Sequence, residues 1–318
     1  MVIRNFALAA AASATALGTA PAVAQDAEAQ VFQPTGTWTA DFGEDYCRLL
    51  RTYSDGNDQL TVAFERIQPG PFMRMLIIGD SFRTFRGAER IGYGFDPLGT
   101  NASSDLATSQ TGDGQRLSIL GTVSLNDQPK FNRVFQAREG AEEASPEPEA
   151  VEDTPQFPGY DPAAELERAG QVTSMTFDEG MRRDLRIETG NLAPAMEVMQ
   201  NCAKDLLRVW GIDPERHQNL SRGAFPTQGR LISNRTVPFD QFARLTGNYN
   251  QVRIMIDAEG AATSCHIHFP TLEANVNERI CDQVMENASF YPALDADGQP
   301  TASYWLVPVF VLFGPPGS

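Results

Sequence analysis

Basic residues are scarce in this sequence of 318 residues. Lys and Arg number 25 against 41 Asp and Glu, so the formal net charge is −16 at pH 7. Nucleic-acid-binding proteins need a basic surface, and adsorption to anionic lipid needs clustered Lys and Arg. The charge balance therefore argues against both classes of partner and favours solubility.

Long hydrophobic runs are missing after the N-terminus. A membrane-spanning helix needs about 20 apolar residues, and the longest later run, residues 305–313, is too short. At the N-terminus, Arg4 precedes an Ala- and Leu-rich stretch, and Ala22-Val23-Ala24 forms a small-x-small cleavage site. We predict a signal peptide over residues 1–24, cleaved after Ala24, and a periplasmic mature protein. An uncleaved membrane anchor is the alternative.

Residues that build catalytic and metal sites are few. The sequence has three histidines and no EF-hand pattern, phosphate-binding glycine loop or Gly-x-Ser-x-Gly elbow. His266 and His268 stand two apart on a predicted strand, which places both on one face, and we interpret them as surface-facing. Gly79-Asp80-Ser81 resembles the first block of GDSL-type hydrolases, but their histidine and oxyanion blocks are missing, so Ser81 has no base to activate it. We predict no catalytic residue, metal or cofactor, with a hydrolase as a weak alternative.

The cysteines are four in number and contain no Cys-x-x-Cys motif. An even number in an exported chain predicts two disulfides. Three pairings are open, and the sequence alone does not choose among them. We favour Cys265–Cys281, because these residues are close in the chain and lie in predicted regular elements, and by default Cys47–Cys202.

The region 25–213 has the signals of a mostly-β domain with one packed helix. Apolar residues from Ala195 to Val209 repeat at alternating spacings of four and three, which predicts a helix with one buried face. Asn191 is the predicted N-cap and Gly211 the C-terminal stop. Runs rich in β-branched and aromatic residues, bounded by turn signals, predict strands. These predicted strands cover residues 47–53, 60–67, 72–78, 116–123, 133–136, 172–177 and 184–188.

Two segments lack such patterns. Residues 139–160 are dense in Pro, Glu and Ala, and they cannot bury enough apolar surface to offset the entropy of ordering. We predict a disordered acidic insertion there, inside the first domain. Residues 214–237 are polar and irregular, and we predict a linker to a second domain over residues 238–318.

The second domain has a strand–strand–helix–strand order, which predicts an α+β sandwich of one helix on a small antiparallel sheet. Val252, Ile254 and Ile256 alternate with polar positions and predict a strand. A hairpin turn and a second strand over 263–269 follow. Apolar residues spaced by four predict a helix over 276–288, and residues 301–313 predict a long final strand.

This order resembles the C-terminal domain of TonB-family energy transducers. The family carries a Phe-x-Pro-Ala-x-x-x-Gly-x-Pro signature between helix and final strand, and this sequence has one residue more before the glycine. Some such domains tie the second strand to the helix, as Cys265–Cys281 would. The N-terminal region is similar to the front half of secreted alphaproteobacterial proteins with this domain. The signature residues are Phe290, Pro292, Ala293, Asp295, Gly298 and Pro300.

The resemblance implies non-catalytic protein binding in the cell envelope. TonB domains pair an extended receptor segment with a sheet edge by β-augmentation, so TonB-dependent outer-membrane receptors are the implied partners, and pairing with a second copy is the other use of the strand. Transducers also have a membrane anchor and a long Pro-rich spacer, so energy transduction requires that the N-terminal segment is not cleaved. The predicted partner-binding strand contains Tyr304, Trp305, Val307, Val309 and Val311, and Pro308 predicts an edge or a bulge.

Overall fold

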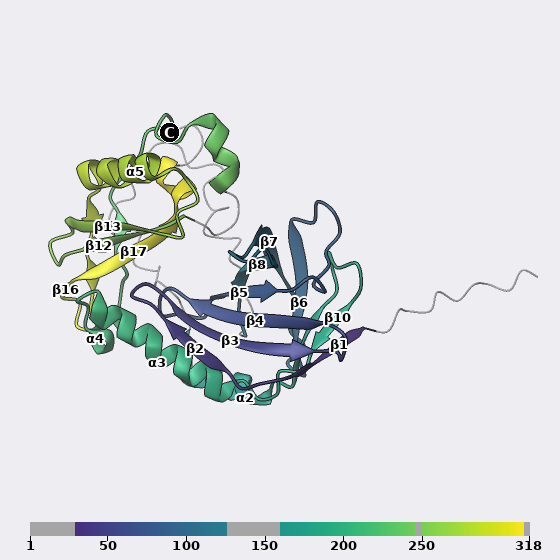
Figure 1. Cartoon of the computed structure of the whole chain (residues 1–318). Helices are drawn as coiled ribbons and strands as arrows, with labels where there is room; N and C mark the ends of the chain where they lie inside the picture. The colour runs from purple at the N-terminus through teal and green to yellow at the C-terminus, as the bar shows by residue number, and fades with distance from the viewer. Residues whose placement is uncertain (1–28, 126–159, 246–249, 315–318) are drawn as a thin grey trace, which may run out of the picture.

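The computed structural model describes residues 29–125, 160–245 and 250–314 (Figure 1). The predicted signal peptide, the predicted strand over 133–136 and the acidic insertion up to residue 159 lie outside these ranges. Among the described residues, no helix is long and apolar enough to cross a membrane.

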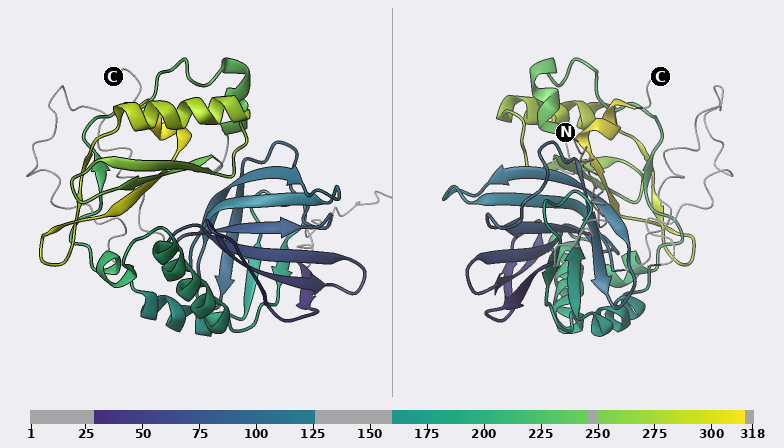
Figure 2. Two further views of the ribbon diagram at one scale, coloured as in Figure 1. Left: turned by 60° about the vertical axis from the view of Figure 1, so that its left-hand side comes forward. Right: turned by 90° about the vertical axis from the view of Figure 1, so that its right-hand side faces the viewer.

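The N-terminal region is a closed β-barrel (Figures 1 and 2). Nine strands follow each other around it in the order β1-β10-β9-β6-β7-β8-β5-β4-β3, and β1 pairs with β3 to close the ring. Only the β1–β10 pair is parallel. The tenth strand, β2 (Thr39–Phe42), pairs along β3. The ring strands are β1 (Gln30–Pro34), β3 (Cys47–Ser54), β4 (Gln59–Arg66), β5 (Met73–Ile78), β6 (Arg90–Asp96), β7 (Ala102–Gln110), β8 (Arg116–Val123), β9 (Ser174–Phe177) and β10 (Leu185–Ile187).

The barrel core consists of the inward-facing side chains of these strands. In β3, for example, Cys47, Leu49 and Tyr53 are buried while the residues between them are partly exposed, which is the alternation that a half-buried strand requires. Phe82 and Phe177 meet edge-to-face inside, with ring centroids 5.2 Å apart. Such aromatic pairs stabilise a core beyond their burial alone.

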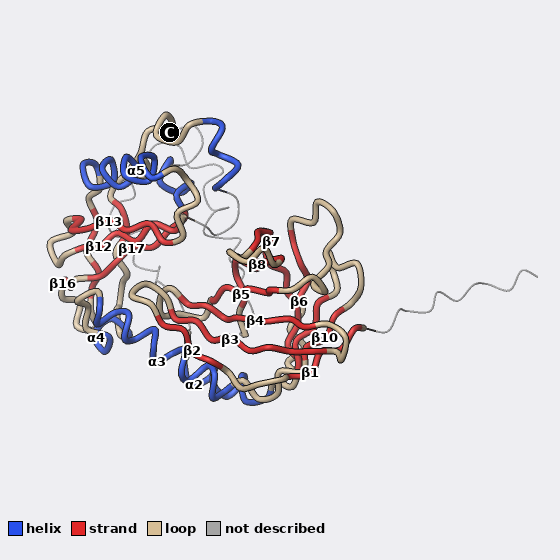
Figure 3. The backbone as a smooth tube through the Cα atoms, in the orientation of Figure 1, coloured by secondary structure: helices blue, strands red, loops and turns tan. Residues whose placement is uncertain are grey.

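Two helices cover one side of the barrel (Figure 3). Helix α3 (Ala193–Val209) confirms the predicted helix, since Ala195, Met199, Cys202 and Leu206 are buried. The predicted N-cap is wrong by one residue: Leu192 is the N-cap, and Asn191 before it accepts a hydrogen bond from the Ala193 N–H. Val209 is 64% exposed, so its predicted burial is wrong; in the same turn Leu206 and Leu207 are the buried residues. Helix α2 (Pro162–Gln171) was not predicted, although Asp161 caps it and Pro162 opens it.

Residues 214–237 are not a free linker. They form helix α4 (Pro214–Gln218) and strand β11 (Phe225–Pro226), which pairs with β14 (Phe290–Tyr291). Leu231, Ile232 and Val237 are buried in the C-terminal core. The prediction of a linker missed this because isolated apolar residues in a polar segment carry no periodic signal.

The C-terminal sheet has the order β13-β12-β17, all antiparallel, with helix α5 on one face (Figures 1 and 2). The predicted strand–strand–helix–strand order is confirmed. The predicted final strand is too long: it breaks at Pro308, and a 3₁₀ helix follows. The elements are η2 (Phe239–Leu245), β12 (Gln251–Ile256), β13 (Ala262–His268), α5 (Ala274–Asn287), β15 (Ala293–Leu294), β16 (Pro300–Thr301), β17 (Ser303–Pro308) and η3 (Val309–Phe313).

Candidate functional site

The sheet of the C-terminal domain uses its two faces differently. Val252 and Ile254 pack under α5, whereas Met255 and Leu306 on the other face contact Leu207 and its neighbours at the end of α3. The C-terminal sheet is thus held between its own helix and the N-terminal domain. Within the described structure both faces of the sheet are therefore covered, and a new strand would have to pair with one of its edges.

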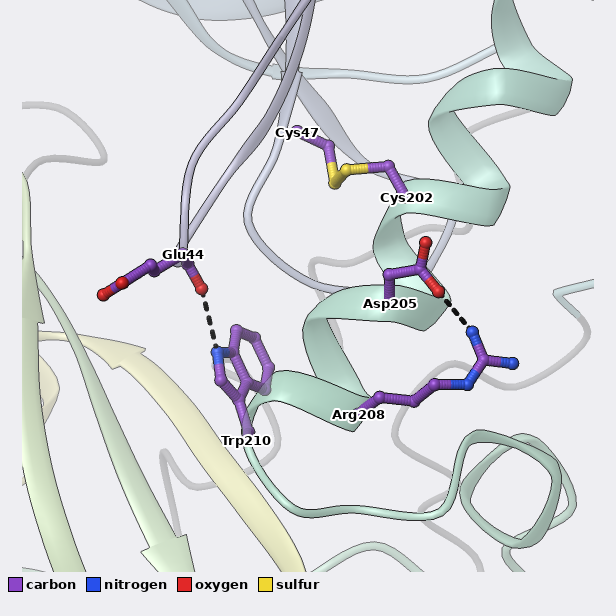
Figure 4. The surroundings of a disulfide bond; sticks show 6 residues. All are labelled: Glu44, Cys47, Cys202, Asp205, Arg208 and Trp210. Carbon is purple, nitrogen blue, oxygen red and sulfur yellow. Dashed lines mark hydrogen bonds and ion pairs between the residues drawn. A yellow bond between two sulfur atoms is a disulfide. The ribbon is translucent and has the colours of Figure 1, made fainter.

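A charged contact joins the two domains beside that apolar contact. Asp45, in the turn between β2 and β3, accepts one hydrogen bond from the Arg253 guanidinium at 2.6 Å and lies 3.1 Å from His266 Nε2. The Arg253 guanidinium also lies 4.1 Å from the centre of the Trp210 ring, and the Trp210 indole N–H donates to the Glu44 carbonyl (Figure 4). The tip of the β2–β3 hairpin is therefore tied to the sheet by the Asp45–Arg253 ion pair, and the end of α3 by the cation–π contact of Trp210 with Arg253.

The histidines all lie at this interface. His266 and His268 share one face, as predicted, but His268 is only 6% exposed, so its interpretation as surface-facing is wrong: the barrel covers it. Burial lowers the pKa of His268 to about 3 and that of His217 to about 4. Desolvation also lowers the pKa of His266, against the opposing effect of Asp45. The two buried imidazoles are therefore neutral at pH 7.

The outer edge of β17 pairs with no strand among the described residues. The Val309 N–H donates to the Asn250 carbonyl at 3.1 Å, and Val307 lies opposite Val252. Because backbone groups alternate between the two sides of a strand, Val307 faces β12, and the N–H and carbonyl of Leu306 face away from it. No other described strand pairs with β17 on that side.

An exposed aromatic cluster adjoins the end of β17. We define it as Phe239 and Phe242 in η2 and Phe310 and Phe313 in η3. Each pair is spaced by three residues, which places both rings on one side of a 3₁₀ helix. Phe242 and Phe313 stack with ring centroids 5.6 Å apart, while Phe239 is 93% and Phe310 50% exposed. Contiguous apolar surface of this kind is typical of interaction sites.

The structure distributes the predicted partner-binding residues over two elements. Tyr304, Trp305 and Val307 lie in β17, whereas Val309 and Val311 lie in η3. Pro308 leaves the ladder without an N–H on the outer side, and the chain turns into the 3₁₀ helix after it. Tyr304 is buried between Trp210 and His217, at ring distances of 5.2 Å each.

The signature residues lie in β14, β15, β16 and the turns between these strands. Phe290 packs edge-to-face on Trp305, Ala293 is fully buried, and Gly298 takes a positive φ of 73° in the β15–β16 turn, which ends at Pro300. Asp295 accepts the N–H groups of the turn and two hydrogen bonds from Arg216 at 2.6 and 2.9 Å. These hydrogen bonds lower the pKa of Asp295, with the Gln299 N–H as the largest contributor. Pro292, the sixth signature residue, offers its carbonyl to Arg222.

Both predicted disulfides are confirmed. Cys47–Cys202 joins β3 to α3 (Figure 4), and Cys265–Cys281 joins β13 to α5. Each therefore fastens a helix to the sheet on which it packs. Two disulfides are consistent with an extracytoplasmic compartment.

Neither the candidate nucleophile nor a metal site is assembled in the described residues. Ser81 lies in the turn after β5, and no hydrogen bond joins it to a histidine within the described ranges. Nor do His, Cys, Asp and Glu gather there in any group of three that would suit a metal ion.

The fold defines the class of this protein: an α+β chain with a nine-stranded barrel, helices, and smaller C-terminal sheets with a helix. Comparisons with protein families, curated protein sequences and solved structures found no match.

Proposed function

We propose that this is a non-catalytic periplasmic interaction protein. Its TonB-like C-terminal domain binds an extended segment of another envelope protein, with TonB-dependent receptors as the favoured partners. The segment adds to the outer edge of β17 as a new strand. The observation that carries this proposal is the open backbone of Leu306, which offers one N–H and one carbonyl to a partner.

The surroundings of that edge support this choice over the opposite edge. Within β17, Trp305, Leu306 and Val307 are partly exposed and apolar. The 3₁₀ helix η3, which carries two residues of the aromatic cluster, follows directly in the chain. The outer edge of the sheet at β13 instead carries exposed Thr263 and Ser264. In β-augmentation the backbone supplies affinity, and apolar side-chain contacts supply specificity, so β17 is the better docking edge.

The test compares two substitutions at one residue. Leu306→Pro removes the outward N–H without touching the β12 ladder, whereas Leu306→Ala removes the same side chain and keeps the N–H. Isothermal titration calorimetry with synthetic TonB-box peptides measures the binding. We expect Leu306→Pro to weaken binding about tenfold relative to Leu306→Ala, because a strand addition loses a buried hydrogen bond.

Both variants must show the wild-type far-UV spectrum and no free thiol. Equal affinity of the two variants would contradict strand addition at β17, and failure of the wild-type protein to bind the peptides would contradict this class of partner. Phe310→Ser should weaken binding without altering the ladder.

A further inference from the structure

A cavity of about 140 Å³ lies where the barrel, its helices and the segment toward the C-terminal domain meet. Its apolar wall includes Pro162, Ala203, Leu207 and Leu220. An apolar cavity of ~150 Å³ in another protein admits a molecule as large as benzene. This space is therefore large enough for a small ligand, and junctions between domains are common places for such sites.

A buried ion pair includes Arg66, which lines the cavity. Arg66 and Glu165 are both fully buried and pair at 2.5 Å. The second oxygen of Glu165 accepts from Tyr160 at 2.9 Å and from Gln200 at 2.8 Å. Both oxygens of the Glu165 carboxylate therefore already accept hydrogen bonds from the protein itself.

The guanidinium of Arg66 keeps donors without an acceptor. Its Nη2 donates to Glu165, but Nε and Nη1 are buried and have no hydrogen-bond partner among the described residues. Buried donors without acceptors are costly and rare in folded proteins. Because Arg66 lines the cavity, an acceptor that enters it from solution would lie beside this guanidinium.

Two further polar groups line the same cavity. Lys204 lies one turn beyond Gln200 on α3, and His217 presents a buried Nε2 that has no partner among the described residues. With Arg66, Lys204 and Glu165 counted together, the formal charge of the site is positive, in a protein whose overall charge is −16. A net positive site with unused donors selects an anion.

We propose that this cavity binds a small monocarboxylate with an apolar body of about benzene size. The carboxylate accepts from Arg66, with Lys204 and His217 beside it, and the apolar body lies against Leu207 and Leu220. A carboxylate suits the site because a guanidinium binds it with charge-assisted hydrogen bonds. An inorganic anion would leave the apolar wall without a partner.

The probes are benzoate and hexanoate, titrated by calorimetry into the full-length protein at concentrations up to ~10 mM, because ligands of this size bind weakly. Benzyl alcohol has the body without the charge, and acetate and inorganic phosphate have the charge without the body. We expect binding of benzoate or hexanoate that exceeds that of all three comparison compounds. Equal binding of benzyl alcohol, stronger binding of phosphate, or no binding of either carboxylate would overturn the proposal.

Variants locate the binding. Lys204→Gln should raise the Kd for benzoate about fivefold, the effect of one partly exposed charge. Arg208→Gln removes the same charge from the same helix outside the cavity and should leave the Kd within about twofold. Because Arg66→Gln leaves Glu165 buried without its partner and can unfold the barrel, Ala203→Leu serves as the second test: it fills the cavity, keeps every charge and should abolish binding. Equal effects of Lys204→Gln and Arg208→Gln, or unchanged binding in a folded Ala203→Leu protein, would refute the site.

Discussion

At the scale of single residues, Asp45 of the N-terminal domain neutralises the charge of Arg253 in the C-terminal sheet. It pairs with Arg253, whose side chain is 12% exposed. Asp45→Asn leaves that guanidinium without a counter-charge, so we expect the free energy of unfolding to fall by ~1–3 kcal/mol. Urea denaturation measures it. The matched control is Asp105→Asn, in the exposed Arg90–Asp105 pair, which should cost at most ~0.5 kcal/mol. Equal losses in the two variants would show that the Asp45 pair has no special role.

The buried histidines make the stability depend on pH. The folded protein holds His268 and His217 at pKa values of about 3 and 4, against 6.5 for an unperturbed histidine. Below pH 6.5 these two histidines bind protons in the unfolded chain but stay neutral in the folded chain. The free energy of unfolding therefore falls as the pH drops toward the folded-state pKa values.

The expected loss is up to ~2 kcal/mol per histidine at about pH 5. Urea midpoints measured at about pH 7.5 and pH 5 check it, a range in which ordinary carboxylates stay ionised. His268→Gln and His217→Gln should each lose less stability on acidification than the wild-type protein. A variant whose loss equals that of the wild type would rule out its histidine as a source of the dependence.

At the scale of elements, the β12–β13 hairpin depends on one glycine. Gly260 has a φ of 86°, and a Cβ there would collide with the Phe290 carbonyl oxygen. Gly298 has a φ of 73° but nothing within 4 Å of a Cβ. In both variants alanine must adopt a left-handed backbone conformation, which costs ~1 kcal/mol of stability. Only Gly260→Ala must also displace β14.

We therefore expect Gly260→Ala to lower the free energy of unfolding by ~1–3 kcal/mol more than Gly298→Ala does, as overpacked sites do. Thermal unfolding of the two variants provides the comparison. If both lose the same stability, the close approach of β14 to the hairpin is not rigid.

The elements also show what limited prediction from sequence. Strands β3, β4, β5 and β8 were predictable because alternating or continuous apolar runs mark them. Strand β7 was missed because its sequence, Ala-Ser-Ser-Asp-Leu-Ala-Thr-Ser-Gln, has no such run. It is a strand because β6 and β8 pair with it on both sides.

The same limit applies to the candidate site. The cysteine count and the turn residues of the signature indicated which residues are structurally important. The open Leu306 edge depends on the β12–β17 register, and the pairing of Arg66 with Glu165 joins residues 99 positions apart in the sequence. Neither follows from a local pattern.

At the scale of the whole molecule, the N-terminus decides whether the protein has a means of transducing energy. We predict that the mature protein begins at Gln25, because Ala22-Val23-Ala24 has the small-x-small pattern of a signal-peptidase site. Edman sequencing or mass spectrometry of the protein purified from its native envelope determines the start. A retained Met1 would favour the membrane-anchored transducer instead.

The sequence by itself determined the acidic net charge, the two disulfides that four cysteines allow, and the elements with strong local periodicity, and it carries the pattern from which we predict an export signal. These properties depend on composition and on neighbours within a few turns or strand residues. Only the tertiary structure decided the closure of the barrel by β1, the docking of the β2–β3 tip on the C-terminal sheet, the burial of His268 and the cavity beside Arg66. Each of these requires contacts between distant segments, whose stability depends on packing that no local pattern encodes.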